Sequence, residues 1–227
     1  MVEQAASRRD QAVVNFGVFI YDATEPIDLA TYGVLSMARR VEPRIAICTI
    51  APRSGVVSLA NGLRIVPDFD IASAPPLDVL IVTGGPGWSA QSASREVLEF
   101  IRERAGTTLI ASVCTGSMIL AASGILDGKR ATTKCEVVPP EVSPLELMRK
   151  TYPHIDVCRT SLVAHDRIIT GGGVSLCIDT MLYLLQKLYG AEMAAETARI
   201  IEYHRARAAN LEQFPPLLTA RSQTASP

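Results

Sequence analysis

One ten-residue stretch, residues 109–118 with the sequence LIASVCTGSM, constrains the fold more than any other part of the chain. An apolar run there reaches a single cysteine, Cys114, and then changes to small residues. This predicts a buried strand, a sharp turn and a helix over about residues 115–122. Ser112 and Gly116 lie two residues before and after the cysteine. That is the spacing of a nucleophile elbow, where both positions must be small because the backbones of strand and helix come close together.

The alternative for Cys114 is a structural role, because free cysteine is among the residue types most often buried. A second feature favours the nucleophile: the strand expected over residues 79–82 also ends in a glycine loop, residues 83–87 with the sequence TGGPG. In an open parallel sheet the carboxyl ends of the strands face one crevice, so both loops open on the same edge. We therefore expect the N–H groups of Gly85, Gly87 and Thr115 to form an anion-stabilising pocket. The helix N-terminus is expected to favour the thiolate form of Cys114.

The rest of the chain alternates between strand and helix patterns, which predicts a parallel sheet with helices on both faces. The expected strands cover residues 13–21, 44–51, 79–82, 109–113, 129–133, 157–163 and 167–170, and an Asn-Gly pair at 61–62 predicts a hairpin within 56–66. The expected helices cover about residues 26–38, 95–105, 115–122, 176–189 and 191–203, with a short one in the proline-containing region 137–152. The fold class is α/β: a mostly parallel central sheet in one flavodoxin-like domain.

Composition limits the functions that the chain can have. Its 227 residues are 48% hydrophobic with a formal charge of -1. These values predict one globular domain and give no electrostatic reason to expect nucleic acid or a membrane as a partner. We expect the domain to cover residues 13–204, between a flexible N-terminal tail (1–12) and a polar, loosely attached C-terminal tail (205–227). The N-terminus has no apolar signal-peptide core, so a cytoplasmic protein is expected. The five cysteines are scattered without metal-ligand spacing, so neither a metal site nor a disulfide framework is expected.

Six short motifs in order resemble the DJ-1/PfpI superfamily, which has the class I glutamine amidotransferase-like fold. They are FIYDATEPIDL (19–29), DVLIVTGGPG (78–87), SVCTG (112–116), RATT (130–133), IITGGGVSLCID (168–179) and EY (202–203). Together they extend over nearly the whole chain. Within the superfamily the sequence is most similar to the isonitrile hydratase branch, and to the similar domain found ahead of some AraC-type regulators.

The resemblance implies a homodimer whose reactive cysteine lies beside a carboxylate from the first strand-to-helix connection. In this sequence that carboxylate is Asp28, with Asp22 and Glu25 as nearby rivals. A carboxyl group desolvated beside a thiol would have a raised pKa and could exchange a proton near neutral pH. From local sequence alone, Asp28 could equally be a first-turn acid that interacts with the helix dipole. The implied reaction is hydration of a small isonitrile to an N-substituted formamide by Cys114 and Asp28, with no cofactor.

This chain departs from the family pattern at two residues, and two other functions remain possible. Many relatives carry His-Trp after the ATT motif, where this chain has Lys134 and Cys135. That change removes the best candidate for a histidine partner of Cys114, and the other histidines are scattered. A glyoxalase- or deglycase-type activity would use the same thiolate but normally needs such a histidine. The other alternative is a stand-alone ligand- or redox-sensing domain, because the sequence after Tyr203 is too short for a DNA-binding module.

Overall fold

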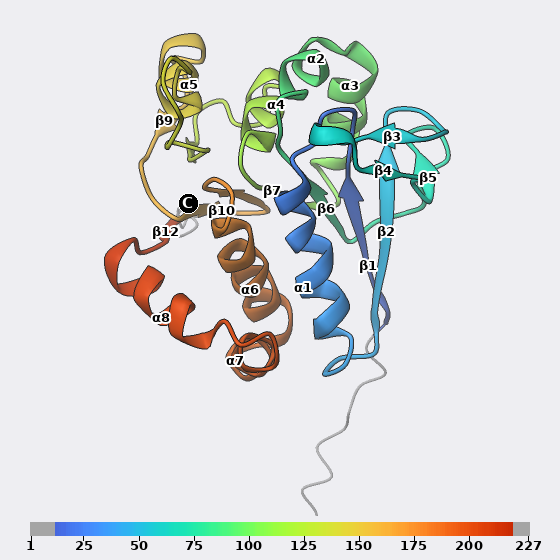
Figure 1. The fold of residues 1–227 in the computed structure, drawn as a ribbon, viewed down its shortest axis with the longest axis vertical. Helices are drawn as coiled ribbons and strands as arrows, with labels where there is room; N and C mark the ends of the chain where they lie inside the picture. Colours follow the sequence, from blue (N-terminus) through green and yellow to red (C-terminus); the bar gives the residue numbers. More distant parts are fainter. Residues whose placement is uncertain (1–11, 220–227) are drawn as a thin grey trace, which may run out of the picture.

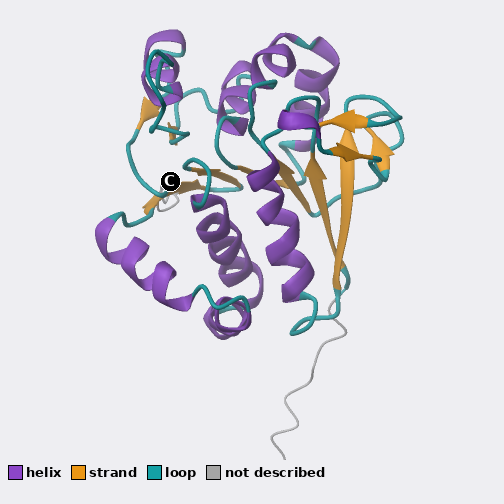
Figure 2. Ribbon diagram, viewed as in Figure 1, coloured by secondary structure: helices purple, strands orange, loops and turns teal. Residues whose placement is uncertain are grey.

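The computed structural model describes residues 12–219, which form three layers with an eight-stranded sheet in the middle (Figures 1 and 2). The strand order is β12-β10-β11-β7-β6-β1-β2-β5. The strands are β1 Val14–Phe19, β2 Ile45–Ala51, β5 Phe69–Asp70, β6 Val79–Val82, β7 Leu109–Ser112, β10 Leu162–His165, β11 Ile168–Gly171 and β12 Leu217–Thr219. All pairs from β11 to β5 are parallel. The predicted fold class, a mostly parallel sheet in a single domain, is confirmed.

Successive side chains of a strand point to opposite sides of the sheet, and here both sides are apolar. Helices therefore cover both faces. In β6, Val79 and Ile81 belong to one apolar core and Leu80 and Val82 belong to the other. The first core is covered by α1 (Ala30–Ala38), α6 (Leu176–Tyr189) and α7 (Ala191–Ile200). The second is covered by α3 (Arg95–Arg104), α4 (Gly116–Ala122) and α5 (Pro144–Thr151). This explains why the central strands are apolar throughout instead of alternating.

Several elements differ in detail from the sequence-based expectation. The helix expected over residues 26–38 begins as a 3₁₀ turn, η1 (Pro26–Leu29), before α1. An unexpected helix, α2 (Trp88–Ala93), follows the glycine loop directly. The predicted hairpin is present as β3 (Val57–Ser58) and β4 (Arg64–Ile65), joined by the turn η2 (Ala60–Gly62). Two further short strands, β8 (Arg130–Ala131) and β9 (Asp156–Val157), pair separately from the main sheet.

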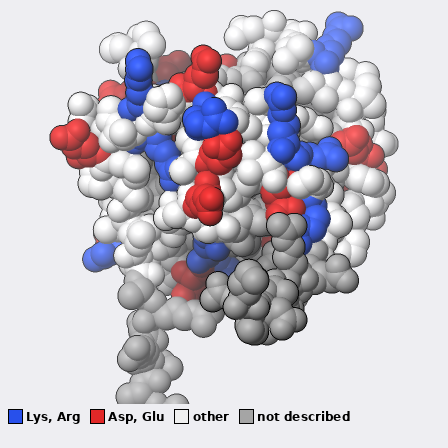
Figure 3. Space-filling view, turned by 90° about the horizontal axis from the view of Figure 1, so that it is seen from below, with Lys and Arg blue, Asp and Glu red and all other residues white. Residues whose placement is uncertain are grey.

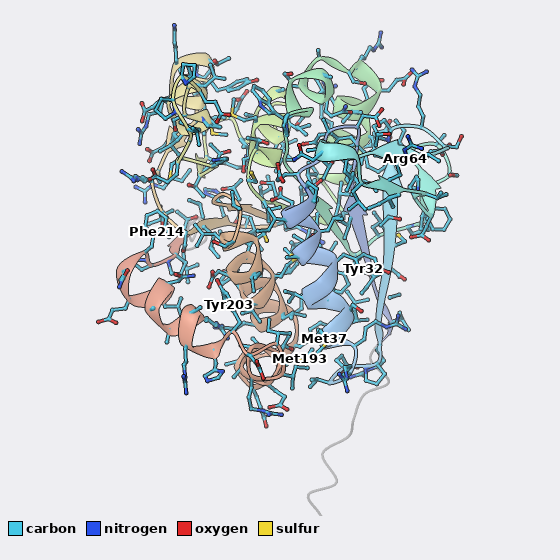
Figure 4. The ribbon with its side chains drawn as sticks, in the orientation of Figure 1. Tyr32, Met37, Arg64, Met193, Tyr203 and Phe214 are labelled. Atoms are coloured by element: carbon cyan, nitrogen blue, oxygen red, sulfur yellow. The ribbon has the colours of Figure 1, made fainter. Side chains whose placement is uncertain are left out.

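The C-terminal segment contradicts the expectation of a loosely attached tail, as far as residue 219. Residues 204–213 form α8 (His204–Gln213), and β12 pairs in parallel with β10 at the edge of the main sheet. Figure 4 labels Tyr203 and Phe214 near the two ends of α8. The polar composition of this segment did not indicate an ordered structure. Its backbone pairs with β10, and its side chains form hydrogen bonds with α6. The predicted tails at residues 1–11 and 220–227 lie outside the described residues.

Charge is mixed on the face of the molecule seen in Figure 3, where lysine and arginine alternate with aspartate and glutamate. Among the described residues, no helix is both long and apolar enough to span a membrane.

Candidate active site

Cys114 occupies the sharp turn between β7 and α4. Its backbone φ is 53°, a left-handed conformation that is unusual for a residue with a side chain. Neighbouring loops hold it there: its N–H donates to the carbonyl of Gly172 at 3.0 Å, and Thr133 Oγ1 donates to its carbonyl at 2.8 Å. A Cβ on Gly116 would collide with the carbonyl oxygen of Val82. The close approach expected for a nucleophile elbow is therefore present.

Asp28 is completely buried within η1. Two hydrogen bonds join its turn to the glycine loop after β6: Glu25 N–H donates to the Gly84 carbonyl at 2.9 Å, and Gly84 N–H donates to Asp28 Oδ2 at 2.7 Å. The other carboxylate oxygen, Oδ1, accepts no hydrogen bond from the described residues. Gly85 must lack a side chain because a Cβ there would collide with Glu25 N. The glycine loop thus serves to hold Asp28 in place.

Burial raises the pKa of Asp28 to about 7, and the hydrogen bond from Gly84 only partly opposes this effect. The charge of Glu25 raises this pKa further, while that of Lys134 lowers it. The sequence-based prediction of a raised carboxyl pKa is confirmed. A group with this pKa is present in both protonation states near neutral pH, as an acid-base catalyst requires.

The expectation of a thiol pKa lowered by the helix N-terminus is wrong. Burial, and next the neighbouring Asp28, raise the pKa of Cys114 to about 12. Hydrogen bonds from the N–H groups of Val174 and Thr115 favour the thiolate but do not compensate. The reason is that removing a thiolate from water costs more than two amide dipoles return. The resting thiol is therefore protonated, and a base must take its proton.

The expected anion pocket is only partly available. Gly85 N–H already donates to Thr115 Oγ1 at 2.8 Å, and Gly87 N–H donates to the Ala23 carbonyl at 3.3 Å. Both glycines shape the loop, but neither amide is free to bind a substrate atom. Thr115 keeps its predicted place, since its N–H is directed at the sulfur of Cys114. The second donor at that sulfur is Val174, which the sequence analysis missed.

Val174 is presented by the loop between β11 and α6, where its own φ is 56°. The run of three glycines before it was a signal that could have identified this loop, because such runs allow close backbone approach. A second omission is Cys177, which is buried in the first turn of α6. Burial, and next the charges of Asp28 and Cys114, raise the pKa of Cys177 to about 12. The site therefore contains two thiols near one carboxyl group.

A cavity of about 660 Å³ opens over Cys114. Apolar side chains make up more than half of its lining, and charged groups lie among them. The lining residues are Glu25, Ile27, Gly85, Pro86, Trp88, Cys114, Thr115, Lys134, Val137, Glu141, Val142, Pro144 and Val174. Trp88, the single tryptophan of the chain, was also missed, because α2 itself was not expected. The cavity is large enough for a small organic molecule.

Asp22 and Glu25, the other two candidates for the catalytic carboxylate, lie in different surroundings. Asp22 Oδ1 accepts a hydrogen bond from Ser58 N–H at 2.8 Å, which ties it to the β3–β4 hairpin. Glu25 lines the cavity and acts on Asp28 through its charge. No histidine is among the residues that line this cavity. In the described part of the chain, no group of three or more His, Cys, Asp or Glu side chains has an arrangement that could hold a metal ion.

Comparison with known proteins shows the family of this chain. The profile of the DJ-1/PfpI family matches residues 17–187, which include the end of β1, the glycine loop, the elbow and most of α6. The chain belongs to the DJ-1/PfpI family. The matched range ends within α6, before α7, α8 and β12.

Among curated proteins, the chain is similar to the isonitrile hydratase of Pseudomonas putida. The two are 31% identical over 195 residues, which cover 84% of this chain and 78% of the hydratase. It is also similar to the HTH-type transcriptional regulator GbdR of Pseudomonas aeruginosa, with 32% identity over 160 residues. That match covers 70% of this chain but only 41% of the regulator.

Solved structures show the same fold at low sequence identity. The crystal structure of Drosophila melanogaster DJ-1beta has a TM-score of 0.71 at 22% identity, covering 85% of this chain and 98% of that one. A ThiJ/PfpI family protein from Pseudomonas syringae has a TM-score of 0.72 at 23% identity, covering 93% and 91%.

Proposed function

We propose that this protein hydrates a small isonitrile to an N-substituted formamide, with Cys114 as nucleophile and Asp28 as proton carrier. The observation that carries the proposal is a buried carboxyl group with a pKa of about 7 beside a thiol on a nucleophile elbow, at the floor of a largely apolar cavity. Similarity to an isonitrile hydratase supports the choice of reaction.

The first step follows from the two protonation states. At neutral pH the thiol holds a proton that the Asp28 carboxylate can take, which gives a thiolate beside a carboxylic acid. The thiolate sulfur forms a bond to the terminal carbon of the isonitrile, and that carbon receives the proton from Asp28. The product is a thioimidate, S–CH=N–R, and no external oxidant or reductant is needed.

The second step uses the same carboxylate as a base. Asp28 takes a proton from water as the water oxygen adds to the thioimidate carbon, and it passes that proton to the nitrogen. The carbon–sulfur bond then breaks while the hydroxyl group of the adduct gives its proton, through Asp28, to the leaving sulfur. The formamide leaves and the thiol is restored with its proton. The N–H groups of Thr115 and Val174 that face the sulfur would stabilise negative charge as it develops there.

The test is turnover of cyclohexyl isocyanide, measured as formation of N-cyclohexylformamide, by the wild type, Cys114→Ala and Asp28→Asn. We expect each substitution to lower kcat/KM by about 10³-fold or more. Cys48→Ala is a matched control, because that half-buried cysteine lies on β2 and does not line the cavity. A wild type that binds but never converts isocyanides would reject the proposal.

The pH dependence gives a second check. Because Asp28 must be ionised to take the thiol proton, kcat/KM should rise with pH through a midpoint near 7, the pKa of that carboxyl group. A profile that is flat from pH 5 to 9 would contradict the role of Asp28 as the base.

A ligand-binding function without turnover is the second candidate, since regulators such as GbdR contain a similar region. The thiol pKa of about 12 argues against redox sensing, because oxidants react with the thiolate form. The absence of histidine from the cavity lining argues against a glyoxalase-type activity. Fluorescence of Trp88, which lines the cavity, would report binding directly and separate a binder from an enzyme.

The assembly that we propose is a homodimer, as the family resemblance implies. Light scattering after size-exclusion chromatography would measure the molar mass, to be compared with 24.4 kDa for one chain.

A further inference from the structure

Lys134 is the one basic residue among the described residues that line the cavity over Cys114. Two acidic residues, Glu25 and Glu141, line the same cavity. A single cation among anions, beside a thiol and a buried carboxyl group, is not explained by the packing of the fold. Its position therefore invites a functional explanation.

The side chain of Lys134 is held in place from three directions. Its backbone carbonyl accepts a hydrogen bond from Leu145 N–H at 3.1 Å, and its Nζ donates to the carbonyl of Glu136. Its stem packs against Gly173, where a Cβ would fall 2.7 Å from Lys134 Cγ. Gly173 adjoins Val174, whose N–H is directed at the sulfur of Cys114. The stem of Lys134 thus lies against the loop that carries one of the two amide donors.

The proposed chemistry starts from one negative charge on the pair formed by Asp28 and Cys114. The charge lies either on Asp28, when the thiol is protonated, or on Cys114, when the carboxyl group has taken the proton. The charge of Glu25 also acts on Asp28, and the charges of this pair act in turn on Tyr21 and Cys177. None of them is a cation. Lys134 opposes the rise of the pKa of both Asp28 and Cys114.

We propose that Lys134 is a positioning residue whose positive charge stabilises the single negative charge shared by Asp28 and Cys114. This proposal rests on the proposed function, because it assigns Lys134 to the proton transfer that starts the reaction. Without the cation, Asp28 would be protonated at a higher pH, and the thiol would lose its base under neutral conditions.

The test measures the alkylation of Cys114, which does not depend on isonitrile turnover. Iodoacetamide reacts when the thiol proton passes to Asp28 and the sulfur displaces iodide. Tryptic cleavage after Arg104 and Lys129 releases residues 105–129, a peptide that contains Cys114 and no other cysteine. Mass spectrometry of this peptide therefore gives the rate at one thiol.

We expect Lys134→Met to shift the pH midpoint of alkylation upward by about one pH unit. Lys134→Met should also lower the ratio of the iodoacetate rate to the iodoacetamide rate by about threefold or more, because the anionic reagent loses its attraction. Lys134→Arg keeps the charge and should restore both values. Lys150→Met is the matched control: it removes an exposed lysine on α5 that does not line the cavity.

The outcomes distinguish this proposal from the proposed function. If Lys134→Met leaves both the midpoint and the reagent ratio unchanged, the role of Lys134 is rejected even where isocyanide turnover is observed. If both values change and Lys134→Arg restores them, the role holds even where no isocyanide is converted. Equal changes in Lys134→Met and Lys134→Arg, with a lowered Tm in each, would show that the residue is only structural and would also reject the proposal.

Discussion

Two buried aspartates of this protein have similar local settings and different hydrogen-bond partners. Asp28 lies in η1 and Asp179 lies in the first turn of α6. Both have a pKa raised by burial, and in both the Oδ1 atom accepts no hydrogen bond from the described residues. A helix first turn is a common place for an acid, so neither position is unusual in sequence.

The two carboxyl groups have different hydrogen-bond partners, and these give them different roles. Asp28 Oδ2 receives one backbone N–H, and the charge of Asp28 acts on the thiol of Cys114, which lines the cavity. Asp179 Oδ2 receives the hydroxyl of Tyr203 and the amide of Asn210, each at 2.8 Å, which ties α8 to α6 (Figure 4). A buried acid with few donors can exchange a proton, whereas one bound by two side chains holds elements together. The hydrogen-bond partners of a buried carboxyl group, and not its burial, therefore decide whether it exchanges a proton or holds elements together.

The largest expected difference between the two acids is in catalysis. Asp28→Asn should lower kcat/KM for an isocyanide by about 10³-fold, because it removes the base. Asp179→Asn should keep kcat/KM within about threefold of the wild type, since the Asp179 carboxyl group is bound by Tyr203 and Asn210 and its charge is not among those that act on Cys114. Steady-state kinetics of both variants gives the answer. Equal losses in the two variants would contradict the distinction drawn above.

The next effect is a gain in stability on removing the Asp28 charge. Its pKa is raised from 3.8 to about 7, so between these pH values the folded protein holds a proton that the unfolded chain has lost. Stability contributed by this group is therefore lost as pH rises from about 4 to 7. Asp28→Asn removes that loss and should raise the free energy of unfolding at pH 8 by about 1–3 kcal/mol, with little change at pH 4.5. Urea unfolding at both pH values measures it, and an equal gain at both would exclude ionisation as the cause.

Asp179→Ala should destabilise the protein by about 1–3 kcal/mol, because the donors of Tyr203 and Asn210 lose their acceptor. The loss should be concentrated in α8 and β12, which depend on this contact. Hydrogen exchange resolved by segment would measure it as reduced protection over residues 204–219. Reduced protection spread evenly over the whole sheet would argue against a local role.

The smallest expected effect comes from Tyr203→Phe, which removes one hydroxyl. Asn210 still donates to Asp179, so the cost should be about 1 kcal/mol. The double variant with Asp179→Ala should cost little more than Asp179→Ala alone, because both changes remove the same bond. Fully additive costs, measured by urea unfolding, would show that the hydroxyl acts independently of Asp179.

Much of the fold could be predicted from patterns that are local in sequence. The apolar runs of β1, β6 and β7 and the helical spacing of α6 fixed the type of each element, since burial on both faces requires continuous apolar strands. The elbow could be predicted because Ser112 and Gly116 are small, as the close approach of strand and helix requires. The pairing of β12 with β10 was not visible, because a three-residue strand in a polar segment has no periodic signal.

The site was predictable in its residues and less so in its energetics. Cys114 and Asp28 were identified from position and motif, and the structure places the two side chains close enough for their charges to interact. The predicted direction of the change in the pKa of Cys114 was wrong, because the sequence reveals the helix N-terminus but not the depth of burial. Gly85 and Gly87 were assigned as donors because a glycine loop exposes amides, yet their N–H groups are used by Thr115 and Ala23.

The sequence by itself determined most of the strands and helices and the elbow, because each depends on residues that are neighbours in the chain. The choice of Asp28 came from the family resemblance. Only the tertiary structure decided which amides face the sulfur, how far the two pKa values rise, and that Lys134, Trp88 and Val174 enclose the same cavity. These depend on segments as far apart as residues 28 and 174. Desolvation is a property of everything packed around a group, and no local pattern records it.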